Sequence, residues 1–169
     1  MATPDHHTTT IRFVAVSPDH PDAQACLSSY YAELAVRFPA GFDPANGNPT
    51  PEVEALMPPH GVFLVMRDGR GAPLGCGAVH RLAPDVAEIK RMWIDPSLRG
   101  SGWGRNLLGE LERRAHDLGF GIIRLDTASP LTQAIAMYRS AGYREIDPYN
   151  ENPYAHHWFE KTLPPENNP

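Results

Sequence analysis

Proline is the residue that most constrains how this chain can fold. Eighteen of its 169 residues are proline, about twice the average share of roughly 5%. Proline breaks helix interiors and central strands, because it fixes φ and lacks a backbone N–H. The longest stretch without proline runs from Ser97 to Ser129. We therefore expect a long helix, and the strand that follows it, in this stretch.

The rest of the composition is that of a globular domain. Hydrophobic residues make up 41% of the chain, which is enough to build a core. No internal repeat or linker divides the sequence. Residues 1–169 are therefore expected to form a single domain, with tails at about 1–9 and 164–169.

Charge and apolar patterning exclude several classes of protein. The net charge is −5, whereas nucleic-acid binders are usually basic, so we expect no nucleic-acid partner. The chain has no apolar run long enough for a membrane helix and no secretion signal, so neither membrane contact nor export is expected. Its two cysteines, Cys26 and Cys76, are too few for a disulfide framework and are expected to be reduced in the cytoplasm.

Hydrophobic periodicity and turn residues predict a mixed α/β order. The predicted strands are Ile11–Val16, Gly61–Arg67, Leu74–Leu82, Val86–Ile94, Ile122–Thr127, Tyr143–Ile146 and His156–Leu163. The predicted helices are about Pro18–Phe38, Glu52–Met57, Gly102–Leu118 and Ser129–Ala141. This order differs from the strict β-α-β alternation of a doubly wound dinucleotide fold.

A glycine-rich turn between a strand and a helix carries the clearest chemical signal. Gly100, Gly102 and Gly104 lack a Cβ and allow a ligand to approach the backbone closely. The N–H groups and the positive dipole end of the following helix favour a phosphate. Arg99 and Arg105 add positive charge. The turn therefore predicts a phosphate or pyrophosphate site, and a tight connection without a ligand is the alternative reading.

Two better-known phosphate motifs do not fit this turn. It lacks the Gly-Lys-Ser/Thr ending of a P-loop. Asp126 lies near the distance at which a Rossmann domain carries its acidic residue, but four predicted strands precede the turn. The Rossmann fingerprint lies in an early β-α-β unit instead.

Two motifs resemble the GNAT superfamily of acyl-CoA-dependent N-acetyltransferases. The run RGSGWG at Arg99–Gly104 fits the Arg/Gln-x-x-Gly-x-Gly/Ala signature of that superfamily. The run from Ala134 to Tyr143 fits its Ala-x-x-x-Tyr-x-x-x-Gly-Phe/Tyr pattern. With the order of the elements, the resemblance covers nearly the whole chain.

The resemblance implies an α/β, single-domain GNAT-like fold: a mixed sheet of about seven strands with a splayed parallel pair, and about four helices. Acetyl-CoA would lie in the splay as acyl donor, with its pyrophosphate on the glycine-rich turn and its pantetheine arm on the preceding strand. The predicted cofactor-binding residues are Met92, Trp93, Ile94, Arg99, Gly100, Ser101, Gly102, Trp103, Gly104 and Arg105. The acceptor would be a small-molecule or peptide amine. Dimers are common in the superfamily, so the resemblance is also compatible with a homodimer.

Acetyl transfer to an amine requires a base. A primary amine has a pKa near 10.4, so making it neutral at pH 7 costs roughly 4.6 kcal/mol. Some relatives carry a glutamate where this chain has Glu88, which makes Glu88 the predicted base. Strand alternation would place Glu88, Lys90, Met92 and Ile94 on one face. Glu33, a water molecule, and a purely structural Glu88 are the alternatives.

The second catalytic candidate is Tyr138, which matches the tyrosine of the superfamily. There it donates to the departing CoA thiolate, although a tyrosine is a weaker acid than a thiol by about 1.5 pKa units. Its spacing on the apolar face of a helix, taken alone, favours core packing, whereas the match to the superfamily motif favours the catalytic role.

Aromatic and acidic residues on two segments predict the acceptor side. The predicted substrate-binding residues are Tyr30, Glu33, Phe38 and Phe42. The loop Asp147–Pro153 would form the opposite wall, and the carboxylates of the two segments suggest a cationic amine. These carboxylates are Glu33, Asp43, Asp147 and Glu151.

No metal is expected, because the paired histidines lack cysteine or acidic partners at ligand spacing. These pairs are His6–His7 and His156–His157. Two other functions stay open: an acyl-CoA-binding module without turnover, and a nucleotide-binding domain of another fold.

Overall fold

The computed structural model describes residues 10–46 and 49–165. The predicted tail 1–9, and with it the first histidine pair, lies outside the described residues, as does 166–169 of the C-terminal tail. The strands are β1 (Arg12–Ala15), β2 (Gly61–Arg67), β3 (Pro73–Ala83), β4 (Val86–Ile94), β5 (Ile122–Thr127), β6 (Arg144–Ile146) and β7 (His157–Thr162). The helices are α1 (Pro21–Arg37), α2 (Trp103–Asp117) and α3 (Thr132–Ser140), with 3-10 turns at Val53–Leu56 and Pro96–Leu98.

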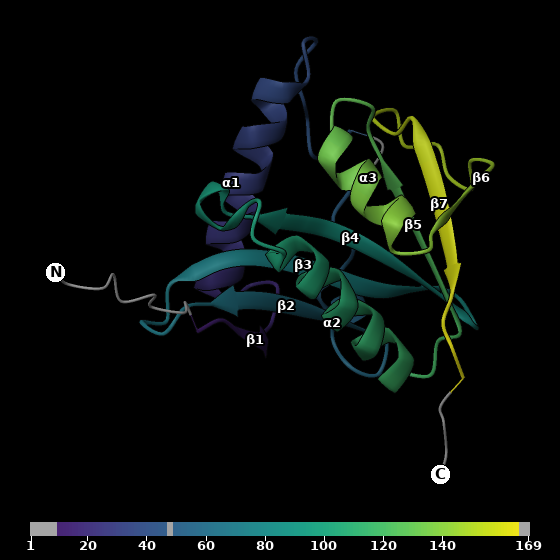
Figure 1. Cartoon of the computed structure of the whole chain (residues 1–169), viewed down its shortest axis with the longest axis horizontal. Helices are drawn as coiled ribbons and strands as arrows, with labels where there is room; N and C mark the ends of the chain where they lie inside the picture. Colours follow the sequence, from purple (N-terminus) through teal and green to yellow (C-terminus); the bar gives the residue numbers. More distant parts are fainter. Residues whose placement is uncertain (1–9, 47–48, 166–169) are drawn as a thin grey trace, which may run out of the picture.

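All seven strands form one sheet in the order β1-β2-β3-β4-β5-β7-β6. The neighbours are antiparallel except β4 and β5, which pair in parallel from Val86 opposite Ile122 to Glu88 opposite Arg124. Beyond Glu88 the two strands continue without pairing, and Figure 1 shows them diverging. The predicted mixed sheet of seven strands with a splayed parallel pair is confirmed.

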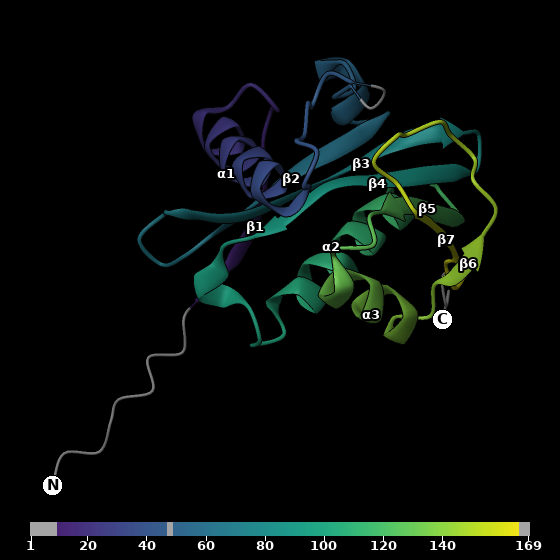
Figure 2. The ribbon, with the colours of Figure 1, turned by 90° about the horizontal axis from the view of Figure 1, so that it is seen from above.

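The helices cover both faces of the sheet. Figure 2 shows α1 on one face and α2 and α3 on the other. Strand β2 is buried on both sides, so its alternate residues enter two separate cores: Leu64 joins the core that includes residues of α2 and α3, whereas Phe63 joins the core that includes residues of α1. This explains why β2 reads as a continuous apolar run.

Local signals locate the helices, but two predicted starts are wrong: α1 begins at Pro21 rather than Pro18, and α3 begins at Thr132, so Ser129 does not cap it. Proline stands at the first position of α1, where its missing N–H costs nothing. Helix α2 buries the stripe Leu107, Leu108, Leu111 and Ala115 against the sheet. The fourth predicted helix, at 52–57, is only the 3-10 turn Val53–Leu56, because prolines on both sides leave no room for a longer helix.

A β-bulge in β4 changes which way its side chains face. Cys76 pairs with Trp93 but Ala78 pairs with Lys90, so two residues of β4, Arg91 and Met92, lie opposite the single residue between them on β3. Arg91 takes a φ of 57°, a left-handed value that is uncommon for a residue with a side chain.

The bulge makes one sequence prediction wrong. Glu88 and Met92 were expected on one face of the strand, but Met92 and Ile94 pack with Ile89 against the core beneath α2 and α3. One inserted residue reverses the alternation, so Glu88 faces the opposite side from Met92.

None of the helices in the described part of the chain has the length and apolar character that a membrane span requires. Within residues 10–46 and 49–165, no three His, Cys, Asp or Glu side chains gather as metal ligands would.

Candidate active site

Two adjoining cavities lie beside the part of β4 that does not pair with β5. The larger, of about 340 Å³, extends from the glycine-rich turn between α1 and α3. The smaller, of about 100 Å³, lies between the splayed strands, α1 and the segment 147–156, which we call the 147–156 loop. Six residues line both cavities: Tyr30, Leu34, Met92, Leu131, Ala134 and Tyr138. The two cavities therefore meet beside Tyr138 and Met92.

The glycine-rich turn presents open backbone to the larger cavity. Gly100 and Gly102 have φ of +80° and +88°, and a Cβ at either would meet no protein atom within 4 Å. Gly102 is also the N-cap of α2, so the first N–H groups of this helix lie directly after it. The turn needs glycine for its conformation, and the space above it admits a ligand.

Eight of the ten predicted cofactor residues line the larger cavity. They are Met92, Trp93, Ile94, Arg99, Gly100, Gly102, Gly104 and Arg105. Ser101 does not line it, and its hydroxyl donates to the carbonyl of Leu98 at 2.6 Å. Trp103 packs against the core instead.

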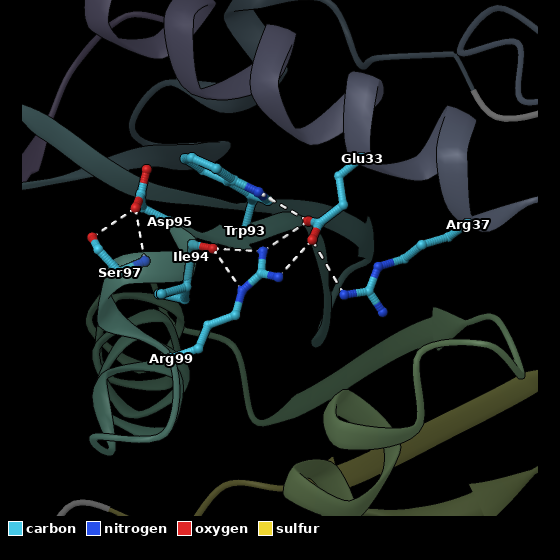
Figure 3. A network of polar contacts seen from close by, with 7 residues as sticks. All are labelled: Glu33, Arg37, Trp93, Ile94, Asp95, Ser97 and Arg99. Atoms are coloured by element: carbon cyan, nitrogen blue, oxygen red, sulfur yellow. Dashed lines mark hydrogen bonds and ion pairs between the residues drawn. The ribbon is translucent and has the colours of Figure 1, made fainter.

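An ion-pair network joins α1 to the turn (Figure 3). The Arg99 guanidinium donates to both carboxylate oxygens of Glu33 and to the Ile94 carbonyl. Glu33 also accepts from the indole N–H of Trp93 at 3.1 Å and from Arg37 at 3.2 Å. The network thereby fixes helix α1 relative to the end of β4.

This network gives Glu33 and Arg99 contacts that differ from their predicted roles. Glu33 lines the larger cavity rather than the smaller one. Burial acts to raise the pKa of Glu33, but the hydrogen bonds from Arg99 and Arg37 outweigh it and hold the pKa below its ordinary value. Arg99 and Arg37 both pair with Glu33, and the third arginine that lines this cavity, Arg105, donates to the Ser140 hydroxyl at 3.1 Å.

Tyr138 lies where the cavities meet. It is 6% exposed, and its hydroxyl donates to the Met92 sulfur at 3.9 Å. Burial raises the pKa of Tyr138, with smaller contributions from Tyr30 and Asp126. Tyr138 is therefore a neutral hydrogen-bond donor aimed at the strand that would hold the thioester arm.

The smaller cavity has an aromatic wall. Tyr30, Phe38 and Phe42, three of the four predicted substrate residues, line it together with Tyr154 of the 147–156 loop. The ring centroids of Phe42 and Tyr154 are 4.6 Å apart, and those of Phe38 and Tyr154 are 5.2 Å apart. The loop thus contributes one wall of the smaller cavity, and its role at an acceptor site stays a prediction.

The carboxylate in the smaller cavity is one that the sequence did not single out for this role. Asp126 of β5 lines the cavity, whereas Glu33, Asp43, Asp147 and Glu151 are not among its lining residues. Asp126 accepts hydrogen bonds from Asn150 at 2.6 Å and Asn152 at 3.1 Å. Burial raises the pKa of Asp126 above its ordinary value, although these two hydrogen bonds offset part of the effect.

Glu88 is 3% exposed and lines neither cavity. Its carboxylate accepts from His80 at 2.9 Å and Tyr149 at 2.6 Å, and it lies 3.3 Å from the Lys90 ammonium. Burial acts to raise the pKa of Glu88, but His80, Lys90 and Tyr149 outweigh it and lower the pKa. The catalytic role of Glu88 stays a prediction, and its contacts anchor the 147–156 loop.

Comparisons with known proteins agree with this geometry. The family model described as "Acetyltransferase (GNAT) family" matches residues 27–143. An uncharacterized N-acetyltransferase of Schizosaccharomyces pombe is 40% identical over 146 residues, covering 85% of this chain and 88% of the relative. An IAA acetyltransferase of Azospirillum brasilense is 34% identical, covering 67% of this chain and 74% of the relative.

The fold has close counterparts among solved structures. An acetyltransferase of the GNAT family from Staphylococcus aureus superposes with a TM-score of 0.71 at 16% identity, covering 92% of this chain and 100% of the other. At 16% identity this similarity supports the fold alone, and membership of the family rests on the family model. The chain therefore belongs to the GNAT family of acetyltransferases.

Proposed function

We propose that this protein is an N-acetyltransferase that moves the acetyl group of acetyl-CoA directly to an amine of a small molecule or peptide. The observation that carries the proposal is the meeting of two cavities at Tyr138 and Met92. One cavity begins at a turn suited to pyrophosphate, and the other is lined by aromatic side chains and one carboxylate, Asp126. A donor and an acceptor that enter from opposite ends would meet there.

Acetyl-CoA would occupy the larger cavity. Its pyrophosphate would lie on the backbone of Gly100 to Gly104, where the dipole of α2 favours negative charge. Its pantetheine arm would run along the unpaired edge of β4 at Met92 to Ile94, because this part of β4 has no β5 partner. The acetyl group would then reach the junction of the cavities.

Tyr138 would donate a hydrogen bond to the sulfur as the C–S bond breaks. The geometry supports this role, because its hydroxyl already donates to a sulfur atom on β4. A raised pKa keeps the hydroxyl protonated before the reaction. Donation to the developing thiolate stabilises the leaving group without a covalent enzyme intermediate.

For the base we favour Asp126 over Glu88 and Glu33. Asp126 lines the acceptor cavity, and its raised pKa makes it a stronger base than an ordinary aspartate. The pKa of Glu88 and of Glu33 is lowered by basic partners, and neither lines the acceptor cavity. In this proposal Glu88 acts on the 147–156 loop through Tyr149.

Binding of acetyl-CoA gives the first test. A ligand at a hundredfold excess over its Kd stabilises the folded state by about 2.7 kcal/mol, which corresponds to a rise in Tm of roughly 5–10 °C for a domain of this size. We expect that rise with acetyl-CoA in thermal unfolding, and none with NAD or ATP. A rise with NAD or ATP and none with acetyl-CoA would exclude the donor site.

An acyl-CoA-binding module without turnover would give the same thermal shift. Release of free CoA in the presence of an amine separates the two functions. Tyr138 at the junction and Asp126 in the smaller cavity favour turnover, because a binding module needs neither.

A further inference from the structure

Two carboxamides of the 147–156 loop donate hydrogen bonds to Asp126. Asn150 Nδ2 donates to one carboxylate oxygen at 2.6 Å, and Asn152 Nδ2 donates to the other at 3.1 Å. Both asparagines come from one short segment between β6 and β7, and Asn152 is only 9% exposed. The loop, which leads into the β5 neighbour β7, thus places both carboxamides on a single carboxylate of β5.

The orientation of each asparagine carboxamide is fixed by the hydrogen bond that its oxygen accepts. The Asn150 oxygen accepts from the Trp158 indole at 2.9 Å, and the Asn152 oxygen accepts from the Tyr154 backbone N–H at 3.1 Å. Each amide oxygen is therefore occupied, so each NH₂ group faces Asp126. Each oxygen of Asp126 therefore accepts a hydrogen bond from one NH₂ group. A proton on either oxygen could point toward its donor and disrupt that bond, so the two bonds favour the ionised carboxylate.

The other groups around Asp126 act in both directions. From β4, the charge of Glu88 disfavours its ionised form and the charge of Lys90 favours it, and these two residues are paired with each other. Arg91 of β4 lines the same cavity, with its guanidinium over the Tyr31 ring. Tyr30 of α1 and Tyr138 of α3 face the cavity as neutral hydroxyls, and burial raises the pKa of both.

We propose that Asn150 and Asn152 are positioning residues that hold Asp126 as an ionised carboxylate facing the acceptor cavity, where it binds the ammonium group of a primary alkylamine and accepts its proton. This inference rests on the proposed function. The aromatic wall of Phe38, Phe42 and Tyr154 would hold the apolar part of the amine.

The proton balance of the reaction follows. One proton passes from the ammonium to Asp126, and the neutral nitrogen forms the C–N bond with the thioester carbonyl. The C–S bond then breaks, and its electron pair leaves with the sulfur. Tyr138 donates a hydrogen bond to the thiolate, which takes up the second proton of the nitrogen as the amide forms, and the proton on Asp126 passes to solvent.

The test measures the pKa of Asp126 directly. Side-chain carboxyl carbons of the ¹³C-labelled protein are titrated by NMR, with the Asp126 signal assigned by its loss in Asp126→Asn. Removing one donor in Asn152→Ala should raise the Asp126 pKa by about one unit. Asn152→Asp, which keeps the shape but adds a like charge, should raise it further. Gln24→Ala removes the carboxamide of an exposed residue that lines neither cavity and should leave the Asp126 pKa unchanged.

Kinetics with phenethylamine and acetyl-CoA provide the second readout. Activity requires ionised Asp126, so kcat/KM falls as the pH drops through the Asp126 pKa. In Asn152→Ala the acid limb of the profile should shift to higher pH by the same amount as the pKa. Asp126→Asn should lose about a hundredfold in kcat/KM with this alkylamine and much less with aniline, which is already neutral at pH 7.

The outcomes distinguish failure of the positioning role from failure of the proposed function. An unchanged Asp126 pKa in Asn152→Ala and Asn152→Asp overturns the positioning role, and that result needs no turnover. Equal losses for phenethylamine and aniline in Asp126→Asn overturn the role of Asp126 in proton transfer. Absence of turnover in the wild-type protein with any amine speaks against the proposed function instead.

Discussion

Replacing Gly102 with valine is expected to abolish acetyl-CoA binding, with a rise in Kd of at least about a hundredfold. Gly102 has a φ of +88° and caps α2 with no side chain. A β-branched residue at this φ is strained by about 1–3 kcal/mol, and its side chain would fill the open space above the turn where the pyrophosphate is proposed to lie. Isothermal titration with acetyl-CoA measures the change.

Gly71→Val is the matched control. Gly71 lies in the hairpin between β2 and β3 with a φ of +83°, and a Cβ there also meets nothing within 4 Å. It lines neither cavity, so the same backbone strain should lower stability but leave the Kd for acetyl-CoA unchanged. Equal loss of binding in both variants would mean that strain alone explains the effect and that the turn is not the pyrophosphate site.

Tyr138→Phe is expected to lower kcat by roughly a hundredfold with little change in the Kd for acetyl-CoA. The variant removes one hydroxyl at the junction of the cavities and leaves the packing of the ring in place. Because the hydroxyl acts on the leaving sulfur, its loss should raise the barrier of the chemical step rather than weaken binding. Steady-state release of CoA thiol gives kcat.

Tyr143→Phe controls for loss of a buried hydroxyl. Tyr143 is 4% exposed, its ring centroid is 5.9 Å from that of Tyr138, and its hydroxyl donates to Glu112 away from both cavities. It should lose stability but keep kcat. Full turnover in Tyr138→Phe would remove Tyr138 from the mechanism.

Local signals were sufficient to predict most of the fold. Prolines, glycines and apolar spacing located the strands and the long helices, because these residues act on the backbone where they stand. The Ser97–Ser129 stretch does contain the glycine-rich turn, α2 and β5. The splayed pair was predicted from the resemblance to the GNAT superfamily rather than from spacing.

The candidate site was predictable only where the chemistry lies in one segment. The turn at Arg99–Arg105 is such a segment, and most of its residues line one cavity. The β4 bulge is different: it depends on pairing with β3, so alternation along the sequence placed Glu88 on the wrong face. Asp126 likewise looks like an ordinary strand residue until the splay and the 147–156 loop place it in a cavity.

The contacts of Glu33 and Arg99 also depend on tertiary structure. Each residue was read from its own neighbours in sequence, as an acceptor-side acid and a phosphate-binding base. Sixty-six positions separate them, and the ion pair that they form in the fold commits both side chains to joining α1 and the turn.

The most direct measurement of the central claim is a product balance. The protein is incubated with acetyl-CoA and a panel of primary alkylamines, amino acids and peptides with free N-termini, and free CoA thiol and N-acetylated amine are quantified together by mass spectrometry. Transfer predicts that at least one amine gives equal amounts of the two products above the rate in buffer. Saturable binding of acetyl-CoA with no N-acetylated product from any of these amines would contradict it.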